Sequence, residues 1–283
     1  MIFYSYSKIN YTLEVGKKRE DGYHSIRSIV QTVNLKDTVY VETNSSGKIR
    51  VSCNDPKIPC DASNTAYKAA SLFAEKYVSG EGADIHIEKN IPSQAGLGGG
   101  SGNGTCVLMA LNHIYSTELS ENEISDLAAQ IGSDCPLFVL GGTVYMTGRG
   151  EIIRKLPAFP KTYLTIIKPD FSVSTKEAYS MLDSRNTYSS VSVSQMLAER
   201  ENTDFDSLSR SLCNDFEMIN REKITAVKED IFNCGGRFSL LSGSGSSIYS
   251  VFETEKERDA VYDRLKNRYK VYKAESEDNP RLF

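Results

Sequence analysis

The residues best suited to chemistry lie in a glycine-rich segment at 92–104, which reads PSQAGLGGGSGNG. A strand-like pattern precedes it, and Val107, Leu108 and Leu111 follow it with the spacing of an amphipathic helix. Glycines let a backbone approach an anion closely, and a helix N-terminus presents unpaired amide N–H groups to negative charge. The segment therefore predicts a phosphate-binding loop. A flexible surface linker is the less favoured alternative, because linkers do not normally join a strand to an amphipathic helix.

This segment differs from the best-known nucleotide-binding loops. It lacks the Gly-Lys-Ser/Thr ending of a Walker A loop, and no G-x-G-x-x-G spacing fits it, so neither the usual NTPase fold nor a dinucleotide-binding fold is indicated. A second glycine-rich segment, LSGSGSS at 241–247, lies between two strand-like patterns. Asp134, just beyond a helix end at Gly132, and Lys8, in an N-terminal strand, add a carboxylate and an ammonium group. Taken singly, each fits an ordinary helix-end residue or an exposed strand lysine.

The elements that must position these residues alternate between strand and helix patterns, which predicts a mixed α/β (α+β) protein. Strand patterns cover residues 2–15, 28–42, 83–88, 164–168, 237–241 and 248–252. One helix is predicted from Asn64, a favourable N-cap, with Tyr67, Ala70, Ala74 and Tyr77 as its apolar stripe. Another begins at Ser120, which forms a capping box with Glu123, and a third covers 255–269. Residues 144–156 predict a hairpin that turns at 148–150, and 184–194 a serine-rich connection.

Length and composition limit the functional classes. The 283 residues suggest two domains, which we place at 1–158 and 159–283 with a ligand site in the cleft between them. The net charge is −4 with no basic stripe, which argues against nucleic-acid binding. No apolar run approaches the roughly 20 residues of a membrane span, and the N-terminus lacks a secretory signal pattern, so a cytoplasmic protein is expected. The six cysteines and three histidines show no metal-binding spacing.

Several segments in order along the chain match one known family. The loop at 92–101 resembles the second motif of GHMP kinases, Pro-x-x-x-Gly-Leu-Gly-Ser/Gly-Ser-Ser, and 241–247 resembles their third motif. Ser7-Lys8-Ile9-Asn10 resembles the first motif as it occurs in 4-diphosphocytidyl-2-C-methylerythritol kinases, and Asp21-Gly22-Tyr23-His24 follows as in that group. Further matches lie at 132–136, 148–151, 168–169, 173–175 and 214–217. The resemblance covers nearly the whole chain and is weakest at 44–60 and 180–212.

The resemblance implies a two-domain GHMP kinase fold with the active site in the interdomain cleft. It implies transfer of a phosphoryl group from ATP to the 2-hydroxyl of a cytidine-diphosphate-linked methylerythritol, on the route to isoprenoid precursors. Asp134 would be the catalytic carboxylate and Lys8 its cationic partner. Phosphoryl transfer needs positioning and charge stabilisation, which an aspartate that orients the acceptor hydroxyl and a nearby ammonium can supply. Mg²⁺ is implied by the use of ATP, without assigned ligands.

By the same resemblance, Tyr23 and His24 would receive the cytosine, with Asn10 nearby and Tyr179 as a second stacking face. Aromatic rings stack on a heteroaromatic base, and an imidazole can hydrogen-bond to its polar edge. Without the motif, Tyr23 fits a core aromatic and His24 a surface turn residue. The ATP-binding residues implied are Asn64, Pro92, Gly96, Leu97, Gly98, Gly99, Gly100, Ser101, Gly102 and Asn103.

Two positions depart from the family pattern, because Gly102 and Gly104 stand where the family usually has serine and alanine. We therefore expect a looser loop that lacks one hydroxyl group, and we expect Gly104 in the first turn of the following helix. The alternatives are a GHMP kinase for mevalonate, homoserine or a sugar, and a non-catalytic ATP-binding sensor on the same fold. The segment 21–24 argues against the former, and Asp134 with Lys8 against the latter. The sequence predicts no oligomeric state.

Overall fold

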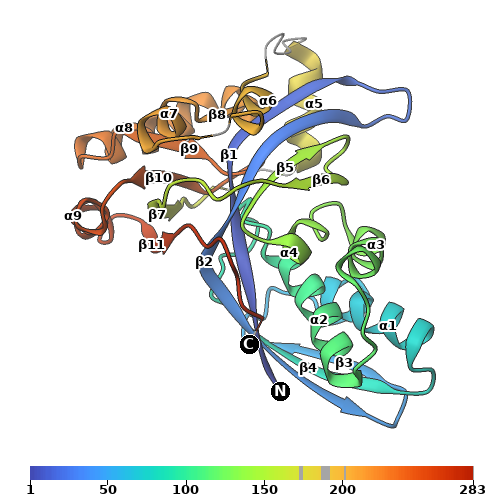
Figure 1. The fold of residues 1–283 in the computed structure, drawn as a ribbon. Helices are drawn as coiled ribbons and strands as arrows, with labels where there is room; N and C mark the ends of the chain where they lie inside the picture. Colours follow the sequence, from blue (N-terminus) through green and yellow to red (C-terminus); the bar gives the residue numbers. More distant parts are fainter. Residues whose placement is uncertain (172–174, 186–191, 201, 283) are drawn as a thin grey trace.

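The computed structural model describes residues 1–171, 175–185, 192–200 and 202–282, which form two β-sheets with helices packed on each (Figure 1). The strands are β1 (Ile2–Lys18), β2 (His24–Asn44), β3 (Ile49–Cys53), β4 (Gly82–Glu88), β5 (Thr143–Thr147), β6 (Ile152–Lys155), β7 (Tyr163–Lys168), β8 (Cys213–Asn214), β9 (Phe238–Leu241), β10 (Ile248–Phe252) and β11 (Lys270–Glu275). The helices are α1 (Thr65–Tyr77), α2 (Gly99–Tyr115), α3 (Glu121–Ile131), α4 (Leu137–Leu140), α5 (Thr175–Arg185), α6 (Val193–Ala198), α7 (Phe205–Arg210), α8 (Arg221–Asn233), α9 (Glu255–Leu265) and the 3₁₀ helix η1 (Asp215–Met218).

The first sheet is organised around β1 and β2, a long antiparallel pair that runs most of the length of the molecule (Figure 1). Its strand order among the described residues is β3-β4-β2-β1-β8, and β5 and β6 extend it beside the first half of β2. β2 therefore pairs with β5 through residues 28–31 and with β4 through residues 38–44. Both strands are longer than predicted, and the short edge strand β3 was not predicted.

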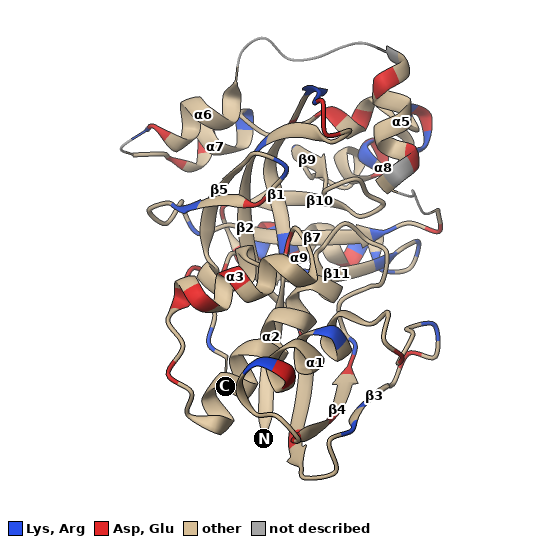
Figure 2. Ribbon diagram, turned by 90° about the vertical axis from the view of Figure 1, so that its right-hand side faces the viewer, with Lys and Arg blue, Asp and Glu red and all other residues tan. Residues whose placement is uncertain are grey.

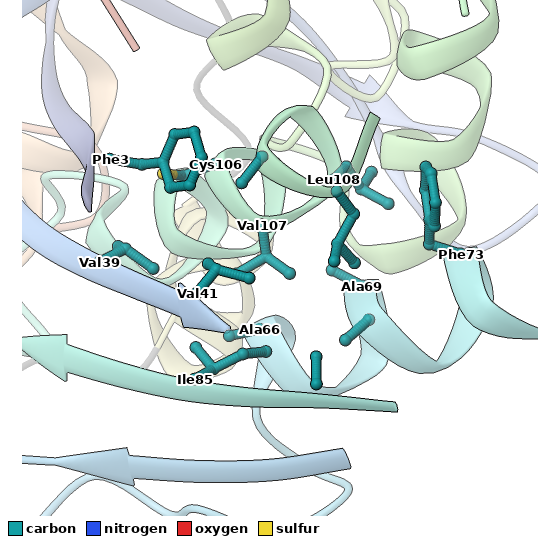
Figure 3. Close-up of a cluster of buried hydrophobic side chains, with 14 of the residues drawn as sticks. Phe3, Val39, Val41, Ala66, Ala69, Phe73, Ile85, Cys106, Val107 and Leu108 are labelled. Carbon is teal, nitrogen blue, oxygen red and sulfur yellow. The ribbon is translucent and has the colours of Figure 1, made fainter. Parts of the chain in front are cut away.

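Helices α1 and α2 cover one face of this sheet and enclose the first hydrophobic core (Figure 3). Alternate residues of the strands face the helices, as the two-residue period of a strand requires. The buried side chains of this core include Phe3, Val39, Val41, Ile85, Val107 and Leu108. The buried residues of α1 are Ala66, Ala69, Ala70 and Phe73. Of the predicted stripe, Ala70 is therefore buried, and Tyr77 packs partly buried against the same core. The three buried alanines keep α1 close to α2.

The second sheet has the antiparallel order β11-β7-β10-β9 and carries α8 and α9. Its core joins Ile167 and Ile248 of the sheet to Ile231 of α8 and Val261 of α9. Thr254 and Glu257 form a capping box that starts α9. The predicted helix over 255–269 was too long, because α9 ends at Leu265 and the chain enters β11 at Lys270.

Two segments from the second half of the chain return to the first sheet. β8 pairs in parallel with β1, with Thr12 opposite Cys213. After β11 the chain runs along β2 and β1, where Glu277 N donates to the Thr32 carbonyl (2.8 Å) and Tyr4 N to the Leu282 carbonyl (2.7 Å). The two termini consequently lie close together (Figure 1). The division at 158 and 159 stays a prediction.

Some expectations fall on residues outside the described part of the chain. The serine-rich connection at 184–194 lies largely there, as do two positions of the 173–175 match. In the described part, basic and acidic residues are both spread over the two halves of the molecule (Figure 2). None of the helices described has the length and apolar character needed to cross a bilayer.

Candidate active site

The three sequence motifs meet where the two sheets face each other. Lys8 N, on β1, donates to the Leu97 carbonyl of the first glycine-rich loop (3.0 Å). Gly243 N, in the second glycine-rich loop, donates to Asn10 Oδ1 (3.0 Å). Ser242 Oγ donates to the Gly96 carbonyl (3.0 Å), which joins the two loops directly. Segments from the beginning, middle and end of the chain thus form one site.

The first loop has a backbone that only glycine adopts readily. Gly96 has φ +73°, and a Cβ there would lie 2.0 Å from the Ser242 carbonyl oxygen. Gly98 is the N-cap of α2 with φ +70°, and it contributes no side chain to cap the helix. The first amide N–H groups of α2 are therefore free of a side-chain cap and can receive an anion, which the positive end of the helix favours.

The two departures from the family pattern lie in α2 and not in the loop before it. Gly102 and Gly104 are buried within α2, which begins at Gly99, so Gly104 is not in the first turn. A Cβ at Gly102 would lie 2.8 Å from the Tyr6 carbonyl oxygen, and one at Gly104 would lie 3.1 Å from Thr65 Cβ. These glycines let α2 approach β1 and the start of α1 closely.

Lys8 and Asn10 form the buried centre of the site. Lys8 is 5% exposed, and its Nζ donates to Asn10 Oδ1 (2.7 Å). Asn10 Nδ2 donates to Ser28 Oγ (2.9 Å), so both ends of this amide are engaged. Burial lowers the pKa of Lys8, and the nearby carboxylate of Asp134 partly offsets that effect. The structure thus places Asn10 with Lys8 and the second glycine-rich loop.

Asp134 lies in the turn between α3 and α4, on the same site. Thr105 Oγ1, on α2, donates to the Cys135 carbonyl (2.8 Å) and so fixes this turn against the helix that follows the first glycine-rich loop. Burial, with a further contribution from the Asp134 charge, raises the pKa of Tyr179 to about 12. Asp134 is therefore near both Lys8 and Tyr179. No ion pair within 4 Å joins Asp134 to Lys8 in the described residues, so the two charges act on each other across a gap.

The side chains of two predicted ATP-binding asparagines form hydrogen bonds within the protein. Asn64 caps α1, accepting from Ala66 N (2.8 Å) and donating to the Pro59 carbonyl (2.6 Å). Asn103 Nδ2 donates to Asp37 (2.9 Å), a fully buried carboxylate that also pairs with Lys89. Asp37 and Lys89 were not predicted from the sequence, because a charged pair split between distant segments leaves no local pattern.

The remaining predicted ATP-binding residues lie on or beside the first loop. Leu97 is buried in the core between the sheets, and Pro92 is half-buried at the start of the loop. Gly99 and Gly100 form the first turn of α2, and the Gly100 carbonyl accepts from Thr65 Oγ1 (2.6 Å). The Ser101 side chain hydrogen-bonds to Cys135, next to Asp134.

The residues predicted for the base lie at one end of the β1–β2 pair, beside α5. His24 is 6% exposed, and its ring stacks on Tyr179 with centroids 5.2 Å apart and planes at 23°. His24 Nδ1 donates to the Gly16 carbonyl (2.9 Å). Its Nε2 lies 3.0 Å from Asp183 Oδ1, a close contact outside hydrogen-bond geometry. Tyr23 is 58% exposed. The structure brings His24 and Tyr179 together, with Tyr23 next to His24 in the chain, and places Asn10 further along β1.

Helix α5 connects the two ends of the site. Thr175, its first residue, shares a hydrogen bond with Ser244 of the second glycine-rich loop (Oγ1 to Oγ, 2.9 Å). Lys168 Nζ, at the end of β7, donates to Ser246 Oγ of the same loop (2.7 Å). These contacts were not predicted from the sequence, although Lys168 and Thr175 fall within segments that resemble the family.

Models of one protein family match two parts of this chain. Residues 64–142 match the family described as GHMP kinases N terminal domain, and residues 196–271 match GHMP kinases C terminal. The chain belongs to the GHMP kinases. It is therefore a small-molecule phosphotransferase that acts on an alcohol group.

Individual members of the family are similar to this chain over almost its whole length. A 4-diphosphocytidyl-2-C-methyl-D-erythritol kinase from Clostridium perfringens is 37% identical over 94% of this chain and 93% of the relative. A kinase of the same name from Caldicellulosiruptor saccharolyticus is 38% identical over 94% of this chain and 93% of the relative. A crystal structure of 4-(cytidine 5'-diphospho)-2C-methyl-D-erythritol kinase is 29% identical, with a TM-score of 0.78 over 97% of this chain and 98% of the other. A homoserine kinase from Cytophaga hutchinsonii, 19% identical with a TM-score of 0.75 over 99% and 95%, shares the fold.

Proposed function

We propose that this GHMP kinase transfers a phosphoryl group from ATP to the 2-hydroxyl of 4-diphosphocytidyl-2-C-methyl-D-erythritol, in the cytoplasm, on the route to isoprenoid precursors. The observation that carries the proposal is the pair of relatives above, which bear this name and are 37% and 38% identical over 94% of the chain. The stacked rings of His24 and Tyr179 and the exposed ring of Tyr23, next to His24 in the chain, support it, because a cytosine needs flat ring faces.

The geometry supports a separate role in phosphoryl transfer for the start of α2, for Lys8 and for Asp134. The uncapped start of α2, at Gly98 and Gly99, would hold the ATP phosphates on backbone N–H groups. The Lys8 ammonium would offset the charge that develops on the transferred phosphoryl group, and its burial in a water-poor site strengthens that interaction. Asp134 would orient the acceptor hydroxyl and take its proton as the new bond to phosphorus forms. The gap between Lys8 and Asp134 is where the hydroxyl would lie.

Mg²⁺ would enter with ATP. The described residues contain no group of three or more His, Cys, Asp or Glu that could hold a metal ion by themselves. Mg²⁺ bound with substrate phosphates needs only one or two protein oxygen ligands, and it keeps several waters. The carboxylate of Asp134 and the hydroxyl of Ser101, which hydrogen-bonds to the neighbouring Cys135, fit that need. When bound, Mg²⁺ would neutralise phosphate charge.

The decisive experiment incubates the protein with MgATP and the cytidine-diphosphate-linked methylerythritol and measures ADP together with a new phosphorylated product. Methylerythritol phosphate without the cytidine should be a poor acceptor, because binding energy from the remote base helps to position the hydroxyl. Mevalonate, homoserine and a sugar serve as competing acceptors in parallel reactions. Equal or faster turnover of any of these would replace the proposed substrate, and ATP binding without turnover of any acceptor would favour a sensor.

A further inference from the structure

The exposed ring of Tyr23 has an arginine over one of its faces. The guanidinium carbon of Arg149 lies 5.0 Å from the ring centroid, within the range of a cation–π contact. Tyr23 sits at the turn that joins β1 to β2, where its side chain is largely in solvent. In the described residues it has no aromatic stacking partner. The family-like segment Gly148-Arg149-Gly150-Glu151, which the proposed mechanism leaves without a role, supplies this contact.

The local sequence explains how Arg149 reaches Tyr23. Gly148 and Gly150 have φ of +71° and +111°, and they form the turn between β5 and β6. β5 pairs with β2, and the Gly148 carbonyl accepts from Ile26 N (2.8 Å), so the turn lies beside the start of β2 (Figure 1). Glu151 accepts from Arg149 N and its Oε1 lies 3.8 Å from Arg149 Nε. The two glycines shape the turn, and the glutamate holds the arginine.

We infer that Arg149 is a positioning residue for base recognition, which holds the Tyr23 ring with one face covered and the opposite face available to the cytosine. This inference rests on the proposed function, since it assumes that Tyr23 receives a pyrimidine. A tyrosine on a solvent-exposed turn samples several rotamers, and a ligand that stacks on it must first immobilise it. A cation over one face reduces that cost before the ligand arrives, and it leaves the other face free.

A different role for Arg149 is direct contact with the diphosphate of the substrate, because guanidinium groups bind phosphate well. The two roles predict different behaviour toward cytidine, which has the base without phosphate, and cytidine diphosphate, which has both. A residue that positions Tyr23 affects both ligands equally. A phosphate-binding residue affects only cytidine diphosphate.

The first experiment measures the affinity of cytidine and of cytidine diphosphate for wild type, Arg149→Ala and Arg149→Lys by calorimetry. Arg149→Ala should weaken both ligands by about 2- to 5-fold, the size of an exposed cation–π contact, and raise the KM of the cytidine substrate equally. The KM for ATP and kcat should not change. Arg149→Lys should recover part of the loss. The matched control is Arg154→Ala, which removes a cation 5.6 Å from the Tyr145 ring on the same hairpin and should leave both affinities unchanged.

A second experiment tests positioning without any ligand. The chain contains no tryptophan, so Tyr23→Trp introduces a single indole fluorophore. Its fluorescence anisotropy should fall when Arg149→Ala is added and should not change with Arg154→Ala. In a Tyr23→Ala background, Arg149→Ala should have no further effect on cytidine affinity, because its action passes through the ring.

The outcomes separate this inference from the proposed function. Loss of affinity for cytidine diphosphate alone would make Arg149 a phosphate ligand and overturn the inference. Unchanged anisotropy of the indole, or an Arg149→Ala effect that persists in Tyr23→Ala, would overturn it as well. If wild type binds neither cytidine nor cytidine diphosphate, the proposed substrate is wrong, and the inferred role of Arg149 in base recognition is wrong as well. In that case a fall in anisotropy would still show that Arg149 holds the residue 23 side chain.

Discussion

The proposed phosphate end of the site (Lys8, Asn10 and the two glycine-rich loops) and its proposed base end (Tyr23, His24 and Tyr179) are built in different ways. At the phosphate end, Lys8 and Asn10 are 5% and 4% exposed, and their polar atoms are joined to both glycine-rich loops. At the base end, Tyr23 is 58% exposed and is held by one cation on a neighbouring hairpin. The phosphate end depends on backbone shape that only particular glycines allow. The base end depends on a few side chains at the edge of the molecule.

This difference has a consequence for substitutions. Changes at the phosphate end should disturb either the chemical step or the fold, because each group there has several partners. Changes at the base end should mainly alter the affinity for the acceptor, because the base lies away from the reacting hydroxyl. A phosphate end fixed by the fold, with an adjustable base end, would let one fold accept different acceptors.

The largest effect is expected from Asp134→Asn. This change keeps the size of the side chain and removes its ability to take a proton, so kcat should fall by roughly 10²- to 10⁴-fold. The measurement is steady-state turnover of the cytidine substrate with saturating MgATP. Activity within a few-fold of wild type would remove Asp134 from the reaction.

The Asp134→Asn measurement needs a control for folding and a second variant at Lys8. The melting temperature and the affinity for ATP should stay close to those of wild type in Asp134→Asn. Lys8→Ala should lower kcat to a similar degree, and the double variant should lose less than the product of the two effects, because the two groups act as a unit. Fully multiplicative losses would show that Lys8 and Asp134 contribute separately.

A smaller effect, on stability, is expected from Gly102→Ala. The added methyl group would lie 2.8 Å from the Tyr6 carbonyl oxygen, a backbone atom that can shift only with β1. We expect a loss of about 1–3 kcal/mol in the free energy of unfolding, as for other overpacked sites. Urea unfolding monitored by circular dichroism measures it.

Gly104→Ala is the matched variant, two residues further along α2. Alanine gains about 1 kcal/mol in helix propensity over glycine, but its Cβ would lie 3.1 Å from Thr65 Cβ. The two effects oppose each other, so its stability should stay within about 1 kcal/mol of wild type. If Gly102→Ala proved as stable as Gly104→Ala, the close approach of α2 to β1 would not be what requires glycine at 102.

The sequence predicted the phosphate end better than the base end, for physical reasons. Glycine-rich loops and capping residues leave local patterns, so the loop at 92–104, the Asn64 cap and the box at Ser120 were all visible. Contacts between distant segments leave none, which is why the pairing of Asp37 with Lys89 and the Arg149 contact with Tyr23 were missed. Gly102 and Gly104 were assigned to the loop and not to α2, because their role in helix packing depends on neighbours outside their own segment.

At the base end, His24→Ala should raise the KM for the cytidine substrate by roughly tenfold, or about 1.4 kcal/mol of binding. The variant removes the ring that stacks on Tyr179 and the contact with Asp183. The KM for ATP should change little. His86→Ala is the control, since His86 also lies near a tyrosine ring (Tyr40, 5.9 Å) but on another part of the first sheet. An equal effect of both variants, or a raised KM for ATP in His24→Ala alone, would contradict the assignment of the base pocket.

The smallest effect at neutral pH is expected from the titration of Lys8. Burial lowers the pKa of this ammonium group, and the Asp134 carboxylate partly offsets the shift. Only the protonated form can offset charge on the transferred phosphoryl group, so kcat should fall as the pH rises through the lowered pKa. This fall forms the alkaline limb of the plot of kcat against pH. It should occur at a lower pH than the titration of an ordinary lysine.

Two variants decide whether that limb belongs to Lys8. Asp134→Asn removes the carboxylate that raises the pKa of Lys8, so the limb in its residual activity should move to lower pH. Lys8→Arg supplies a cation that does not deprotonate in this range, so whatever activity remains should show no alkaline limb. The profiles require kcat at saturating concentrations of both substrates, since KM reports the base end as well. An identical limb in wild type and Lys8→Arg would assign the titration to another group, and the phosphate end would then owe its charge stabilisation to the backbone N–H groups of α2.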